Sequence, residues 1–230
     1  IVHEWPLVQA MVCLSFALAA WMISRKSYFE MAARALYQYS SVTLMATLSY
    51  LLLWRLGMAF HLYAFPEALP IYSRTCLLTA VLFLAFRFKV HWAWLPYAAL
   101  SAIAGSFVFG LDIVSAEPVF YSIALVSLAL AYGALPVCFN SLRSPLDRMS
   151  VLLSSANVCY AVYLYLSHPT QGTGWMFLLG TLLTLHAFFY FIRTSGISWA
   201  YLGAIYGYAS VYFNGIARER KSTSLNSNYG

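Results

Sequence analysis

Long apolar runs separated by short polar links fill almost the whole sequence. The clearest example is a pair of runs near the end of the chain, residues 174–192 and 199–213, joined by a short turn and followed by a basic tail. An apolar run of about 20 residues is long enough to cross the hydrocarbon core of a bilayer as a helix. A helix also satisfies every backbone hydrogen bond within the segment, as the core requires. The sequence therefore predicts transmembrane helices.

Charge is too scarce to build a water-facing surface. Only 9% of the 230 residues are charged, whereas soluble domains carry about 25%. We expect an all-α polytopic integral membrane helix bundle of seven to eight transmembrane helices in residues 1–214, with a polar C-terminal tail at 215–230. The expected helices are the runs 6–23, 37–60, 71–86, 92–111, 118–139, 150–166, 174–193 and 199–213. No repeat linking the two halves is evident, so an inverted-repeat transporter gains no support.

Lysine and arginine in the links set the expected orientation. Under the positive-inside rule, the richer set of helix ends faces the cytoplasm. The richer set is Arg25, Lys26, Arg34, Arg87, Lys89, Arg143, Arg148 and Arg193; the other is Arg74, Arg218, Arg220 and Lys221. This puts the start of the chain on the non-cytoplasmic side of a plasma or inner membrane. The basic tail breaks the pattern, so residues 198–213 either cross or lie in the interface. Because the net charge of +6 sits at helix ends, nucleic acid is not an expected partner.

Carboxylates and cysteines argue against several chemistries. The acidic residues are Glu4, Glu30, Glu67, Asp112, Glu117, Asp147 and Glu219, all at predicted loops or helix ends. Carriers coupled to protons or sodium usually need a carboxylate inside the membrane. Neither a C-x-x-C pair nor an H-E-x-x-H motif is present, so no metal site is expected.

Three polar residues within the apolar runs are candidate ligand contacts. His186 is the one ionisable group near the centre of a predicted span, where it is either a ligand contact or a neutral imidazole bonded to Thr184, Asn157 or a tyrosine. Asn157 follows Ser154 and Ser155 and can hydrogen-bond across helices or contact a substrate. Arg55 lies about one turn from its helix end, where it either reaches lipid phosphate or binds an anionic partner.

The last apolar run carries two further patterns. Gly203 and Gly207 are four residues apart, a spacing that permits close helix packing. Tyr201, Tyr208 and Tyr212 share one helical face. This face is either an aromatic belt at the membrane interface or the wall of a site for a planar or lipidic ligand.

The function expected from these features is non-enzymatic. The chain would be a scaffold, anchor or sensor subunit of a larger membrane assembly, with the lipid bilayer and other membrane subunits as partners. The alternative is a transport or ligand-uptake component that binds a small or lipidic molecule within the bundle. A third reading is a lipid-modifying enzyme using His61, Glu67 and His168. No cofactor is predicted, and bound lipid is expected.

Overall fold

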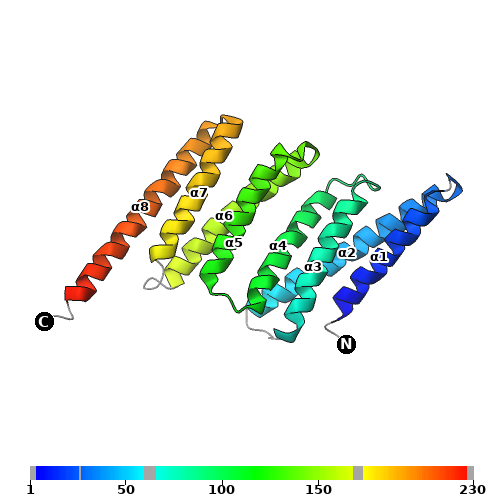
Figure 1. Cartoon of the computed structure of the whole chain (residues 1–230), viewed down its shortest axis with the longest axis horizontal. Helices are drawn as coiled ribbons and strands as arrows, with labels where there is room; N and C mark the ends of the chain where they lie inside the picture. Colours follow the sequence, from blue (N-terminus) through cyan, green and yellow to red (C-terminus); the bar gives the residue numbers. More distant parts are fainter. Residues whose placement is uncertain (1–3, 26, 60–65, 168–172, 227–230) are drawn as a thin grey trace. The chain divides into compact units, whose positions relative to one another are not determined.

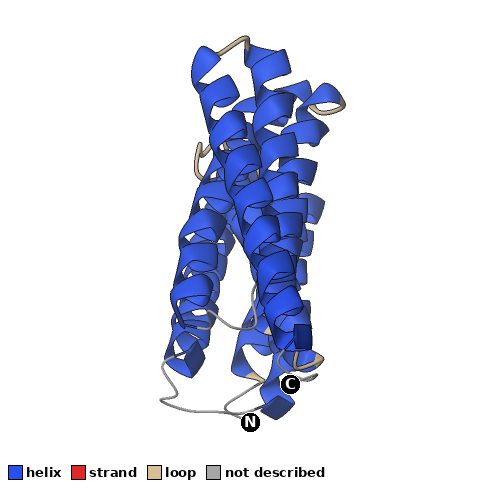
Figure 2. Cartoon of the chain, turned by 90° about the vertical axis from the view of Figure 1, so that its left-hand side faces the viewer, coloured by secondary structure: helices blue, strands red, loops and turns tan. Residues whose placement is uncertain are grey.

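A computed structural model describes residues 4–25, 27–59, 66–167 and 173–226. Within these residues the regular structure is helical, as Figure 2 shows by colour. The α-helices are α1 (Trp5–Ile23), α2 (Glu30–Ala59), α3 (Leu69–Phe86), α4 (Leu95–Ile113), α5 (Pro118–Ala134), α6 (Arg143–Ser167), α7 (Thr173–Thr194) and α8 (Ile197–Asn226). Short 3-10 turns cover Ser27–Phe29, Pro66–Ala68, Leu135–Val137 and Asn140–Leu142. The prediction of an all-helical fold is confirmed.

Proline marks where several helices begin or end. α1, α3 and α4 each carry a proline in the first turn, where the missing N–H has no helical partner to lose. Pro136 ends α5, which gives way to the 3-10 turn at Leu135–Val137, because proline cannot continue an α-helix. α6 begins at Arg143, inside the polar stretch that the sequence suggested was a loop.

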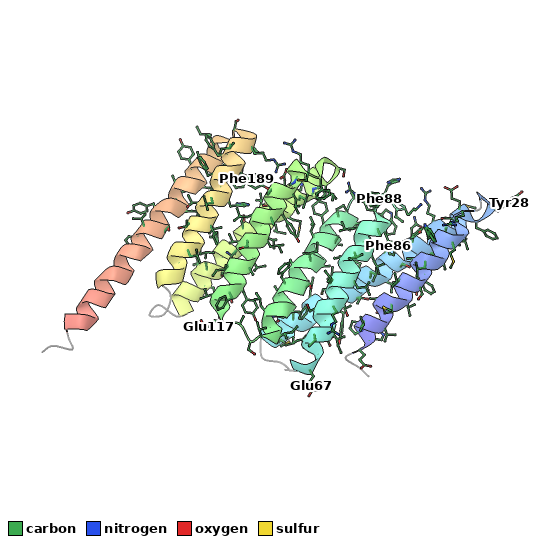
Figure 3. The ribbon with its side chains drawn as sticks, viewed as in Figure 1. Tyr28, Glu67, Phe86, Phe88, Glu117 and Phe189 are labelled. Carbon is green, nitrogen blue, oxygen red and sulfur yellow. The ribbon has the colours of Figure 1, made fainter. Side chains whose placement is uncertain are left out.

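The described chain divides into two compact units, residues 1–116 and 117–230. In unit 1, α1 pairs with α2 and α3 pairs with α4, while α1 and α2 also pack on α3 (Figure 1). An aromatic core links three of these helices: Tyr72 contacts Trp54 edge-on at 4.6 Å between ring centroids and Phe109 at 5.7 Å. Figure 3 places Glu67 at one end of this unit and Tyr28, Phe86 and Phe88 at the other.

Unit 2 is built from α5–α8. α5 pairs with α6, α7 pairs with α8, and α5 packs on α7. Its apolar core joins Val126 of α5, Ala161 of α6 and Leu179 and Leu183 of α7. The α7–α8 turn is tight because Ser195 adopts a left-handed conformation, with φ of 52°, a common way to end a helix.

The two units repeat one arrangement. Each has two hairpins whose first helices pack together, α1 on α3 and α5 on α7. Most buried residues of α6 lie 113 positions after a buried residue of α2, and the buried residues of α7 lie 104 positions after a buried residue of α3. The α2/α6 pairs are Ala33/Leu146, Tyr37/Ser150, Ser41/Ser154, Leu44/Asn157 and Leu48/Ala161; the α3/α7 pairs are Tyr72/Met176, Thr75/Leu179, Thr79/Leu183, Leu82/His186, Phe83/Ala187 and Phe86/Tyr190. The match lies in the pairing of helices and in which positions are buried, whereas the sequence itself shows no evident repeat.

Four of the described helices are long and apolar enough to cross a membrane. They are α1–α4, with mean hydropathies of 1.9, 1.2, 1.7 and 1.4 over their most apolar windows. The described part of unit 2 has shorter apolar helical stretches, Val119–Ala134 and Leu178–Thr194. The structure therefore supports a membrane location, while the count of seven to eight spans stays a prediction. α8 also continues as a helix to Asn226, through most of the stretch expected to be a polar tail.

Candidate functional site

A partly buried ion pair lies where the end of α7 meets the start of α6. Arg193 donates two parallel hydrogen bonds to Asp147, Nη1 to Oδ1 at 2.7 Å and Nη2 to Oδ2 at 3.1 Å. Nη1 also donates to the Gly133 carbonyl at 2.9 Å, so the guanidinium ties the ends of α5, α6 and α7 together. The side chains are 14% and 30% exposed. Two-pronged pairing of this kind is the strongest geometry available to a carboxylate and an arginine.

Tyr190 extends this polar group toward the interior of unit 2. Its hydroxyl donates to Asp147 Oδ1 at 3.1 Å, and its ring stacks on Trp199 of α8 at 4.8 Å. Space beside the ring is tight: a Cβ on Gly133 would lie 3.2 Å from Tyr190 Cε2 and 3.3 Å from Ser150 Oγ. The absence of a side chain at Gly133 therefore lets α5, α6 and α7 approach at this level.

Ser150 and His186 form the next layer. Both are buried, and His186 Nε2 lies 2.8 Å from Ser150 Oγ. Ser150 Oγ also lies 2.6 Å from the Ala129 carbonyl oxygen, to which it donates. A carbonyl can only accept, and a serine hydroxyl has one proton to give. With the serine proton donated to the Ala129 carbonyl, His186 carries its proton on Nε2 and donates to Ser150.

This direction of hydrogen bonding has a chemical consequence. A serine nucleophile needs a neighbouring base that accepts its proton. Here the imidazole nitrogen facing Ser150 is a donor, and the serine proton is held by a backbone carbonyl. In this arrangement the pair is a hydrogen-bond relay between α5, α6 and α7.

Asn157 lies two helical turns beyond Ser150 on the same face of α6. It is fully buried, and neither its amide nitrogen nor its amide oxygen has a hydrogen-bond partner among the described residues. Ser122 of α5 is also fully buried with an unpartnered hydroxyl. α5 and α6 are antiparallel, and Ser150 of α6 bonds to Ala129 of α5. Seven residues, or about two turns, forward along α6 and backward along α5 therefore place Asn157 opposite Ser122. Burying such groups without partners costs free energy.

Unit 1 has aromatic or leucine side chains at four of the matching positions, whereas Arg34 and Lys89 stand at those of Asp147 and Arg193. Where unit 2 has Ser150 and Tyr190, unit 1 has Tyr37 and Phe86, whose rings touch at 5.5 Å. Leu44 stands at the position of Asn157 and Leu82 at that of His186, all of them buried. The arrangement can therefore be built without these polar groups. We take the polar set of unit 2 (Asp147, Ser150, Asn157, His186, Tyr190 and Arg193) as the candidate functional site, because its members are buried or partly buried and most of them bond to one another.

The predicted tyrosine face lies apart from this site. Tyr201, Tyr208 and Tyr212 are 65%, 76% and 56% exposed, and Tyr208 stacks on Tyr212. The tyrosine of α8 that turns inward is Tyr206, which lines an apolar cavity of about 110 Å³ with residues of α6 and α7, among them Val158, Ala161 and Leu183.

Both predicted packing glycines face α7. A Cβ on Gly203 would lie 3.6 Å from Ala187 Cβ, and one on Gly207 would lie 3.7 Å from Thr184 Oγ1, both ordinary contact distances. The closest approach falls at Gly180 of α7, where a Cβ would be 2.8 Å from Ser210 Cβ. Thr184, which the sequence offered as a partner of His186, instead donates to the Gly180 carbonyl at 2.7 Å. The hydrogen-bond partner of His186 is Ser150.

Arg55 has a protein partner in unit 1. Its Nη2 donates to Asp112 Oδ1 at 3.0 Å and its Nε lies 2.7 Å from Asp112 Oδ2. This pair joins the ends of α2 and α4, so the charge of Arg55 is compensated inside the unit. Asp112 belongs to the last turn of α4 and not to a loop.

Sequence reasoning missed Asp147, Ser150, Tyr190 and Arg193 as members of the site. Pro145 could have signalled them, because a proline in a first turn places the start of α6 ahead of Asp147. Of the loop residues considered for lipid chemistry, His61 and His168 lie outside the described residues, and Glu67 is in the 3-10 turn Pro66–Ala68.

Metal ligands do not cluster in the part of the chain that the structure describes: no group of three or more His, Cys, Asp or Glu residues comes together there. The four cysteines are free. The sequence matches no protein-family model, and comparison with curated proteins and with solved structures finds no significant match.

Replacing Asn157 by leucine tests whether its burial is costly. Asn157→Leu introduces the residue that unit 1 has at this position, Leu44. We expect the free energy of unfolding in detergent to rise by about 1–3 kcal/mol, because an unpartnered buried amide is removed. Ser154→Ala is the control, since its hydroxyl donates to Val151 on its own helix. A loss of stability for Asn157→Leu alone would mean that the amide has a partner in the native protein.

Proposed function

We propose that this chain is a multi-pass integral membrane protein of seven or eight transmembrane helices that serves as a non-enzymatic scaffold, anchor or sensor subunit of a larger membrane assembly. The observation that carries the proposal is the closed polar network of unit 2. Asp147 and Arg193 neutralise each other, and Ser150 joins His186 to a backbone carbonyl. These four side chains and Tyr190 bond to one another or to backbone across α5, α6 and α7, as a structural role requires.

Helix lengths support the membrane placement. α7 has 22 residues and α8 has 30, so at about 1.5 Å per residue each helix is as long as a core of about 30 Å, with Leu178–Thr194 as the apolar part of α7. Pairing Asp147 with Arg193 lowers the cost of placing those charges near a bilayer. Large apolar side chains on α1, such as Val8, Leu18 and Met22, are more than half exposed and would face lipid.

Charge distribution in unit 1 supports the proposed orientation. Arg25, Arg34, Arg87 and Lys89 flank the helix ends near Tyr28 and Phe88 (Figure 3). At the opposite end Arg55 is neutralised by Asp112. The positive-inside rule then places the start of α1 on the non-cytoplasmic side of a plasma or inner membrane.

Labelling with a serine-reactive fluorophosphonate tests the non-enzymatic part of the proposal. We expect Ser150 to remain unlabelled, because its proton is donated to Ala129 and its neighbour His186 acts as a donor. The readout is peptide mass spectrometry of the labelled protein in mild detergent. Labelling of Ser150 that His186→Ala abolishes would reverse this assignment and point to a hydrolase.

Purification from native membranes tests the subunit role. A tagged chain extracted in mild detergent should migrate with one or more other membrane proteins in fixed stoichiometry, measured by native mass spectrometry. An unrelated multi-pass protein expressed at the same level is the control for non-specific co-purification. Recovery as a monomer at native abundance would overturn the subunit role.

A second candidate is uptake or transport of a small or lipidic molecule. It is favoured by the unpartnered amide of Asn157 and by the apolar cavity that Tyr206 lines. Val158→Trp would fill that cavity. Loss of uptake in cells by this variant, with a normal amount of folded protein, would favour transport over the subunit role.

A further inference from the structure

Unit 1 has an apolar groove between α1 and α2. Its volume is about 300 Å³, and its lining includes Trp5, Val8, Gln9, Val12, Phe16 and Tyr39. Trp5 packs edge-on against Tyr50 at one end, with centroids 5.7 Å apart, and Phe16 packs against Tyr39 at the other, at 6.0 Å. The aromatic pairs therefore define the two ends of the groove.

The length of the groove matches one leaflet of a bilayer. Trp5 and Phe16 are eleven residues apart on α1, which corresponds to about 16 Å along the helix. The hydrocarbon of one leaflet is about 15 Å thick. Trp5 opens the helix, at the depth where tryptophan prefers the membrane interface. An occupant lying along α1 would thus start near the headgroups and end near the bilayer centre.

Gln9 contributes an amide to the groove, whose lining also includes the hydroxyl side chain of Thr43 and the polar tips of Trp5 and Tyr39. Gln9 lies one helical turn inside Trp5, and its amide oxygen is enclosed without a hydrogen-bond partner among the described residues. An amide both donates and accepts hydrogen bonds and carries no charge. Among the described residues, none that lines the groove is charged. The groove therefore suits a neutral head group that has both a carbonyl and a hydroxyl.

We propose that this groove binds a single-chain neutral lipid of the monoacylglycerol type, with its head at Gln9 and its chain running toward Phe16. The volume is at the lower end of ligand pockets, which suits one chain better than two. A phosphate head would need a cation that the lining does not provide. The inference rests on the proposed membrane placement of α1, but not on the subunit role.

A photoreactive monoacylglycerol with a diazirine at the end of its chain tests the proposal. With the full-length protein in detergent, we expect labelling of peptides that contain Phe16 or Tyr39. Gln9→Leu should lower labelling about tenfold, because the head loses its amide hydrogen bonds. Ser15→Ala is the matched control on the same helix, since Ser15 bonds to Met11 and does not line the groove. It should label like the original protein.

Three outcomes would overturn the proposal. If Gln9→Leu were labelled as strongly as the original protein, the groove would be a non-selective apolar surface. Equal labelling by a probe with methylated hydroxyls, or by a lysophospholipid probe, would remove the head specificity. A cross-link between two copies through Val8 or Val12 would assign the groove to self-association. The subunit role is tested separately by purification, and accessibility of Glu4 from the non-cytoplasmic side checks the shared membrane placement.

Discussion

Arg193→Met is expected to lower the free energy of unfolding by about 2–3 kcal/mol. The substitution keeps an unbranched apolar stem but leaves Asp147 without its two-pronged partner and the Gly133 carbonyl without the Arg193 donor. Breaking a fully buried ion pair costs about 3–5 kcal/mol. The loss is smaller here because Asp147 is 30% exposed and can recruit water. The midpoint of unfolding in a detergent titration measures the effect.

Arg143→Met is the matched control because Arg143 faces the same carboxylate. Its Nε is 4.0 Å from Asp147 Oδ2 and its side chain is 57% exposed, so a change below about 0.5 kcal/mol is expected. Combining Arg193→Met with Asp147→Asn should recover part of the loss, since the uncompensated charge is removed. Equal effects of the two arginine substitutions would contradict the geometry described for Arg193.

Gly180→Ala is expected to destabilise the α7–α8 hairpin by about 1–3 kcal/mol, the usual cost of overpacking. The added Cβ would lie 2.8 Å from Ser210 Cβ and 3.2 Å from Ser210 Cα. The second atom is backbone, so a side-chain rotation cannot relieve the clash and the helices have to move apart. Thermal unfolding followed by tryptophan fluorescence reports on this contact, because Trp199 lies in the same hairpin.

Gly207→Ala controls for the general effect of alanine at a helical glycine. Its Cβ would have 3.7 Å to the nearest atom of Thr184, so stability should be unchanged or slightly higher. Ser210→Gly in the Gly180→Ala background should restore part of the stability by removing the Cβ that clashes. If Gly207→Ala were the more damaging change, the helix contact would centre on the Gly-x-x-x-Gly pattern instead.

The helical architecture could be predicted from the apolar runs. Such runs favour burial in lipid, and a segment buried in lipid forms a helix because its backbone groups must bond within the segment. The boundary of α6 could not be predicted, since Arg143 and Asp147 make its first turn look like a loop. The repeat was hidden for a related reason: its matching positions share burial and not residue type, as Leu44 and Asn157 show.

The candidate site was predicted in part. His186 and Asn157 stand out in the sequence because polar groups are rare in apolar runs. Their surroundings depend on which helices are neighbours, and the sequence does not show this. The partner of His186 is Ser150, which is 36 positions earlier in the sequence. The tyrosines of α8 share a helical face as predicted, but periodicity alone does not say whether a face turns toward protein or lipid.

The pairing of Asp147 with Arg193 also bears on how the protein is made. The two residues are 46 positions apart, and at about 5–20 residues per second a ribosome delivers the second several seconds after the first. During that interval α6 carries a carboxylate that no arginine of α7 has yet reached. We therefore expect α6 to enter the bilayer together with α7, whereas α1, which has no charged residue, can enter alone.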